Sequence, residues 1–64
     1  MVTIDLSGPQ GNAFALMSLA ATWARQLDYD DVEIEAMLDE MRSGDYSNLI
    51  AVFEDNFGDF VEFV

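Results

Sequence analysis

The hydrophobic and polar positions of this chain predict a short strand at each end and three helices between them. Val2, Ile4 and Leu6 alternate with polar residues, which is the period of a half-buried strand. Residues 7–11 contain two glycines and a proline and predict a turn. Residues 59–64 are mostly β-branched or aromatic and predict a closing strand. Because a lone strand leaves its backbone groups without partners, we expect the two terminal strands to pair.

The first helix is expected over residues 13–27, with Asn12 as its N-cap. Its polar positions form one narrow stripe, so the helix is apolar over most of its circumference, and such a helix is normally buried. Two further helices and two strands cover only part of it. The sequence therefore leaves two alternatives open: a homo-oligomer that covers this surface, or a helix whose alanines are exposed to solvent. The candidate oligomer interface consists of Leu16, Leu19 and Trp23.

The second helix is expected to begin after Asp30, which has the spacing of a capping box with Glu33. It should end at Ser43-Gly44, since glycine is common just past a helix. Asp45 is placed to cap a third helix that runs to about residue 56. The predicted fold class is α+β: one small domain over residues 1–64, in the order β-α-α-α-β, with three helices packed on a two-stranded sheet formed by the termini.

The composition combines 52% hydrophobic residues with a net charge of −11, since 13 acids face only two arginines. The hydrophobic content excludes simple disorder. The charge repels phosphates, so we expect no direct binding to nucleic acid or to an anionic membrane, and we expect basic partners. The apolar run of residues 13–24 is too short and too interrupted to cross a bilayer, and no basic leader precedes it, which favours a cytoplasmic protein.

The chain contains neither histidine nor cysteine, so the usual nucleophile-base pairs and soft-metal sites are absent. We expect no enzyme, no cofactor and no metal. Asp28, Asp30 and Asp31 lie close together, but their spacing does not match a calcium-binding loop. The Gly8 to Asn12 loop precedes a helix, as phosphate-binding loops do, yet it lacks their motifs and any lysine. A structural turn is the favoured interpretation, and ligand binding at this loop is a minor alternative.

The acidic residues are segregated, since eight of the 13 fall within residues 28–45 and none within residues 13–27. A helix surface so rich in acids can engage a basic groove of the kind that binds nucleic acid. The alternative is a solvated face that confers solubility. A second function hypothesis is a structural module that uses the apolar side of the first helix. The predicted partner-binding residues are Asp31, Glu35, Asp39 and Glu40.

The chain also resembles a family of short, uncharacterised acidic proteins encoded by tailed bacteriophages. The resemblance lies in Ile4-Asp5-Leu6-Ser7-Gly8-Pro9, in Ser43-Gly44-Asp45-Tyr46 and in Phe57-Gly58-Asp59-Phe60-Val61, and covers nearly the whole chain. It implies a phage origin and action in the cytoplasm of an infected bacterium. Many such proteins block host or defence proteins, some by imitating DNA, so the resemblance implies an inhibitor of a basic bacterial protein. It implies no activity and no site residues.

Overall fold

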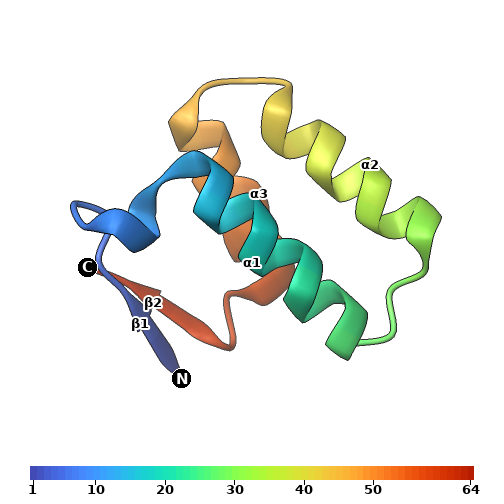
Figure 1. Cartoon of the computed structure of the whole chain (residues 1–64), viewed down its shortest axis with the longest axis horizontal. Helices are drawn as coiled ribbons and strands as arrows, with labels where there is room; N and C mark the ends of the chain where they lie inside the picture. The colour runs from blue at the N-terminus through green and yellow to red at the C-terminus, as the bar shows by residue number, and fades with distance from the viewer.

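The computed structural model describes all 64 residues and confirms the predicted order of strand, three helices and strand (Figure 1). The elements in chain order are β1 (Val2–Ile4), a 3₁₀ helix η1 (Pro9–Gly11), α1 (Ala13–Gln26), α2 (Asp31–Arg42), α3 (Tyr46–Phe57) and β2 (Val61–Phe63). No helix is both long enough and apolar enough to span a membrane.

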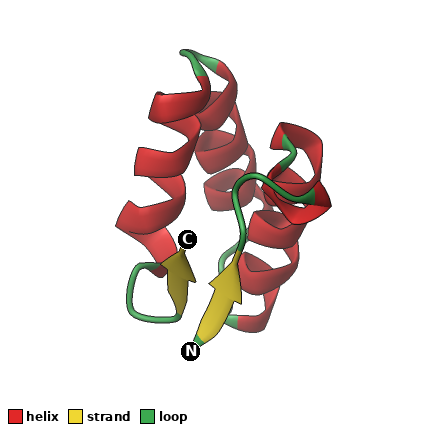
Figure 2. Ribbon diagram, turned by 90° about the vertical axis from the view of Figure 1, so that its left-hand side faces the viewer, coloured by secondary structure: helices red, strands yellow, loops and turns green.

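The two terminal strands pair as expected, and they run parallel (Figure 2). Val2 lies opposite Val61, and Ile4 lies opposite Phe63. The strands are three residues long, shorter than predicted, but the pairing continues past them, because the Leu6 amide donates to the Val64 carbonyl at 3.0 Å. A parallel pair needs a long crossover between its strands. Here the crossover is the whole three-helix segment.

All three predicted helix caps are formed. The Asn12 side chain accepts hydrogen bonds from the amides of Phe14 and Ala15, at 2.8 and 3.3 Å. Asp30 caps α2, and Asp45 caps α3 by accepting from the Asn48 amide at 3.0 Å. Each cap satisfies amide groups that have no partner within the helix. The beginnings of the helices are therefore fixed by single side chains.

The segment before α1 contains the 3₁₀ helix η1, where the sequence predicts only a turn. Pro9 occupies its first turn, where a residue without an amide hydrogen is tolerated. Gly11 is buried, and a Cβ atom there would lie 2.6 Å from the Leu6 carbonyl carbon. The Tyr46 hydroxyl donates to the Gly11 carbonyl and so joins η1 to the start of α3. These contacts give the loop a structural role.

The link between α1 and α2 depends on an uncommon backbone conformation at Asp28. Its φ is +66°, and it is the one residue other than glycine with a positive φ. A left-handed residue just after a helix is a common way to end it, and glycine adopts this conformation with the least strain. The following Tyr29 amide donates to the Ala24 carbonyl at 2.9 Å, which closes the end of α1.

The core lies between the helices and the inner face of the sheet, and aromatic rings dominate it. Phe53 and Phe57 are fully buried, with ring centroids 5.1 Å apart. The Trp23 ring packs on both of them, at 5.5 and 5.6 Å. Phe63 of β2 packs edge-on against Phe53 at 5.5 Å. Since α3 supplies the central pair, it is the element on which α1, α2 and the sheet are assembled.

Candidate functional site

The buried stripe of α2 fixes which side of the helix faces solvent. Ile34, Met37 and Met41 are buried against the rest of the core, and Leu38 is half-buried beside them. At about 100° of rotation per residue, this stripe turns the acids of α2 outward. All 13 acidic residues of the chain are exposed, those of α2 included. We take the solvent-facing side of α2 as the candidate functional site.

The acids at the start of α2 have a role in folding. Asp30 accepts from the Glu33 amide at 2.8 Å, and the Glu33 carboxylate accepts from the Asp30 amide at 3.0 Å, which completes the predicted capping box. Asp31 and Glu33 also lie in the first turn, where the helix dipole favours negative charge. Stabilisation of the helix therefore explains why these acids are present, without a binding partner.

The acids farther along α2 have no such role. The side chains of Glu35 and Glu40 make no hydrogen bond or ion pair within the chain, whereas Asp39 pairs with Arg42 at 2.6 Å. Glu40 lies near the C-terminal end, where the helix dipole disfavours negative charge. The Glu40 backbone carbonyl is satisfied instead by Ser43 and Asn48, at 2.7 and 2.8 Å. Glu35 and Glu40 are thus exposed charges that the fold does not use.

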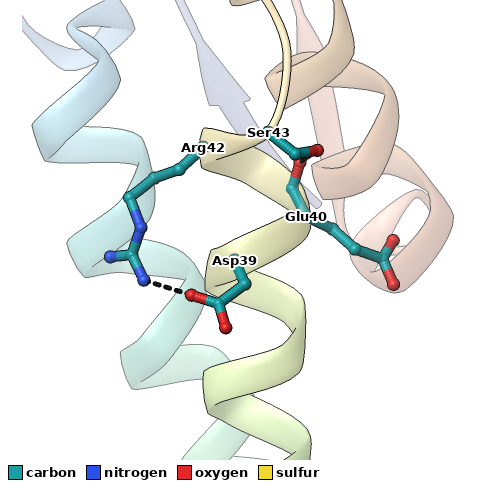
Figure 3. Close-up of polar contacts among 4 residues, drawn as sticks. All are labelled: Asp39, Glu40, Arg42 and Ser43. Atoms are coloured by element: carbon teal, nitrogen blue, oxygen red, sulfur yellow. Dashed lines mark hydrogen bonds and ion pairs between the residues drawn. The ribbon is translucent and has the colours of Figure 1, made fainter.

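The four predicted contact residues do not lie on one face. Asp31, Glu35 and Asp39 recur every four residues and share one flank of α2, whereas Glu40 is rotated by about 100° from Asp39. In Figure 3 the Arg42 side chain extends toward α1, with Asp39 beside it, and Glu40 points the other way, toward α3. The four predicted contact residues are therefore divided between two flanks of α2. Helical rotation separates residues that are adjacent in sequence.

An apolar strip lies between the two acidic flanks. Val32 is 77% exposed and Ala36 is also exposed, and both fall between the flank of Glu35 and the flank of Glu40. An exposed β-branched side chain surrounded by acids is the arrangement of an apolar contact with a charged rim. The outward surface of α2 offers a partner both kinds of contact. We call Val32, Glu35, Ala36, Asp39 and Glu40 the outer face of α2.

The charge of the molecule is concentrated around this helix. Residues 1–27 carry only Asp5 and Arg25 and are neutral as a group. Residues 28–45 carry eight acids and Arg42, a net charge of −7, and residues 46–64 carry four acids, a net charge of −4. The sheet and α2 lie on opposite sides of α1 (Figure 1). The electrostatic field of the protein is therefore directional, with most of the negative charge on and around α2.

The exposed acid Asp5 belongs to a local turn. The Ser7 hydroxyl donates to its carboxylate at 2.7 Å and the Ser7 amide at 2.9 Å. These two hydrogen bonds, the hydroxyl first, lower the pKa of Asp5 below its usual value. They stabilise the charged form and explain this acid as part of the bend that follows β1.

The Gly8 to Asn12 loop is poorly arranged for an anion. Two of the amides at the start of α1 that would bind a phosphate already donate to the Asn12 side chain. Gly11 is buried in contact with the backbone of Leu6. The acids Asp28, Asp30 and Asp31 do not converge on one point either. No three acidic side chains of the chain are grouped in space so that they could hold a metal ion.

The expected apolar interface on α1 is only partly at the surface. Leu16 has no exposed surface, because it packs inside the core, so its assignment to an interface is wrong. Leu19 and Trp23 are half-buried and line two shallow hollows on the side of α1 that faces β1. Val2 and Phe60, which were not predicted as interface residues, line the same side and are half-exposed.

Another apolar hollow lies on the opposite side of α1. It is lined by Phe14, Met17 and Leu38, among others, and Arg42 reaches over its edge. Phe14 is 81% exposed, more than any other aromatic residue of the chain.

Comparisons with protein-family models, with curated proteins and with solved structures found no match.

Proposed function

We propose that this chain is a small acidic binding module whose outer face of α2 engages a basic surface of a bacterial protein. The proposal is carried by one observation: Glu35 and Glu40 are exposed and unpaired, on a helix that does not need them to fold. Solubility requires charge but no particular location for it. These acids instead sit where they repel their neighbours or oppose the helix dipole.

The spacing of the acids supports a partner that binds nucleic acid. The 12 residues of α2 include five acids, Asp31, Glu33, Glu35, Asp39 and Glu40. At about 1.5 Å of rise per residue they carry about one charge per 3.6 Å. One strand of a DNA duplex carries one phosphate per about 3.4 Å. We therefore propose that α2 imitates the charge density of a phosphate strand, with its acids divided between two flanks, and that the protein inhibits its partner by occupying the basic groove.

The setting of this function rests on the resemblance to short phage proteins. We propose that the protein is made in an infected bacterium and acts in its cytoplasm on a host or defence protein. Comparable inhibitors need no catalytic groups, since they act by occupying a surface, and this chain offers no histidine or cysteine for catalysis.

A pair of matched variants tests the proposal. In the first variant, Glu35→Gln and Glu40→Gln neutralise the outer face of α2. In the second, Glu54→Gln and Glu62→Gln make the same chemical change on α3 and β2, and both variants have a formal net charge of −9. The wild-type protein is used as bait in a bacterial lysate, and the recovered partner is purified and titrated with all three proteins.

The first variant should weaken binding and the second should not. Two exposed charge contacts of about 0.2–1 kcal/mol each correspond to a loss of affinity between about twofold and thirtyfold. The loss should shrink as salt is added. Equal weakening by both variants would show that only net charge matters and would refute the outer face of α2 as the site. Recovery of no protein with a basic surface would refute the function itself.

A competition experiment tests the mimicry separately. A short DNA duplex is added to the complex of the purified partner and this protein. Release of the partner by the duplex, in proportion to its concentration, supports binding in a nucleic-acid groove. Simultaneous binding of the duplex and the protein to the partner would exclude mimicry, although a basic surface elsewhere on the partner would still satisfy the broader proposal.

A further inference from the structure

One side of the molecule is lined mainly by apolar residues. It runs along the edge of α1 that faces β1, and its two shallow hollows measure about 260 and 250 Å³. Neither hollow has an acid or an arginine in its lining. In a chain with 13 acids this absence sets the surface apart. We define the α1–β1 face by its apolar members, which are Val2, Leu19, Trp23, Leu27 and Phe60.

The α1–β1 face combines a fixed centre with an exposed rim. Trp23 is half-buried, and its ring is held between Phe53 and Phe57 at about 5.5 Å. Leu27 and Phe60 stand around it, 44% and 46% exposed. A tryptophan that is already held in place loses little conformational freedom on binding, and such residues often dominate the energetics of interfaces.

The charges of the molecule are arranged so that two α1–β1 faces can meet. Residues 1–27, which supply most of this face, have no net charge, and the acids of α2 lie on the far side of α1 (Figure 1). Two copies that meet through the α1–β1 face keep their acidic helices far apart. Any contact that includes the outer face of α2 would instead bring like charges together.

A second copy is the occupant that this face fits. A two-fold interface joins a surface to itself, so the surface must be complementary to itself. Uncharged apolar side chains meet this condition, whereas a cluster of acids does not. The hollow beside Phe14 meets it less well, because Arg42 lies at its edge and α2 borders it. The chain also has a core of only 12 buried residues and no disulfide to stabilise it. Association would add stability, because it would bury apolar surface that folding leaves exposed.

We infer that two copies of this protein form a dimer through the α1–β1 face, with Trp23 at the centre of the contact and the outer faces of α2 directed away from each other. A stable interface needs about 800 Å² from each partner, about a fifth of the 4095 Å² that one chain exposes. The dimer would present two acidic helices to its targets, one on each side. This inference does not depend on the proposed function.

Sedimentation of the protein alone tests the dimer. The average mass should rise from 7.2 kDa toward twice that value as the concentration increases. Added salt should shift the transition to lower concentration, because it screens repulsion between two copies of charge −11. Trp23 is the one tryptophan of the chain, so its fluorescence emission should move to shorter wavelength over the same concentration range as it loses contact with water.

Two variants locate the interface. Phe60→Ala removes an aromatic ring from the α1–β1 face, and Gln26→Glu places two like charges near the two-fold axis with almost no change of shape. Each should raise the dissociation constant about tenfold or more. Phe14→Ala is the matched control, because it makes the same truncation on the other side of α1 and should leave the constant unchanged. Circular dichroism confirms that each variant is folded.

The outcomes separate the dimer from its alternatives. A single species of 7.2 kDa up to about 1 mM protein in high salt would overturn the dimer, and the face would then belong to a different apolar partner. A dimer that dissociates in Phe14→Ala but not in Phe60→Ala, or whose tryptophan emission stays constant, would overturn the α1–β1 face. If Phe60→Ala abolishes the dimer but binding of the basic partner persists, the inference stands and the proposed function is unaffected.

Discussion

The acidic flank of α2 should lower the stability of the protein, and Glu35 is the residue on which this can be measured. Its side chain lies one turn from Asp31 on one side and one turn from Asp39 on the other. Like charges at this spacing destabilise a helix by about 0.2–0.5 kcal/mol per pair. The pairing of Asp39 with Arg42 weakens one of the two repulsions. We therefore expect Glu35→Gln to stabilise the fold by about 0.5 kcal/mol.

Thermal unfolding at low and at high salt measures this effect. In a domain of this size, about 0.5 kcal/mol corresponds to a rise of about 2–4 °C in Tm. The control is Glu62→Gln, which removes the same charge from β2, where Thr3 is the residue opposite. The stability gained by Glu35→Gln should exceed that of the control at low salt. In about 1 M salt, where charges interact over only about 3 Å, the difference should vanish.

Two results would refute this reasoning. Equal stabilisation by Glu35→Gln and Glu62→Gln would mean that only the net charge matters, and that the position of Glu35 between two acids has no effect. A difference that persists in high salt would mean that helix propensity or packing, rather than charge repulsion, distinguishes the two sites. A Glu35→Gln protein that is more stable but binds its partner more weakly would show the trade-off between stability and function expected at a binding surface.

Three further substitutions test the local structure. Asp28→Gly should stabilise the protein by about 1 kcal/mol, measured by thermal unfolding, because it relieves a left-handed backbone and removes an acid from the negative end of α1. Gly11→Ala should destabilise it by about 1–3 kcal/mol, because the added Cβ meets the Leu6 backbone. Ser7→Ala should raise the pKa of Asp5 toward its usual value of 3.8, as followed by NMR titration. The stability that Asp5 contributes is present above its unfolded pKa and is lost as the pH falls through its folded pKa, so in Ser7→Ala this contribution should be smaller and its loss should be complete at a higher pH.

Local side-chain chemistry made much of this fold predictable. The N-caps Asn12, Asp30 and Asp45 are all formed where the sequence places them, because a cap depends on a few consecutive residues. The pairing of the termini was also predictable, since each strand has only the other as a partner. The direction of the pairing was not, because it depends on how three helices turn the chain between residues 6 and 61.

Burial and facing were less predictable than the elements themselves. Leu16 and Leu19 look alike in sequence, but the core covers the side of α1 that contains Leu16 and leaves Leu19 near the surface. Glu40 is next to Asp39 in the chain, yet the buried stripe of α2 turns the two in different directions. In both cases the deciding contact comes from residues distant in sequence. The outer face of α2 therefore emerges only from the assembled helices.

The location of the acids argues that they serve more than solubility. A soluble surface could equally have used the outward stripe of α1, where Ser18, Thr22 and Gln26 are exposed and uncharged. The acids are instead gathered on and around α2, where Glu35 repels its neighbours and Glu40 opposes the helix dipole. Selection for stability alone would spread these charges, and selection for solubility would be indifferent to their place. The proposed contact with a basic surface accounts for both the clustering and its cost, and the same arrangement leaves the hollows of the α1–β1 face without a charged side chain.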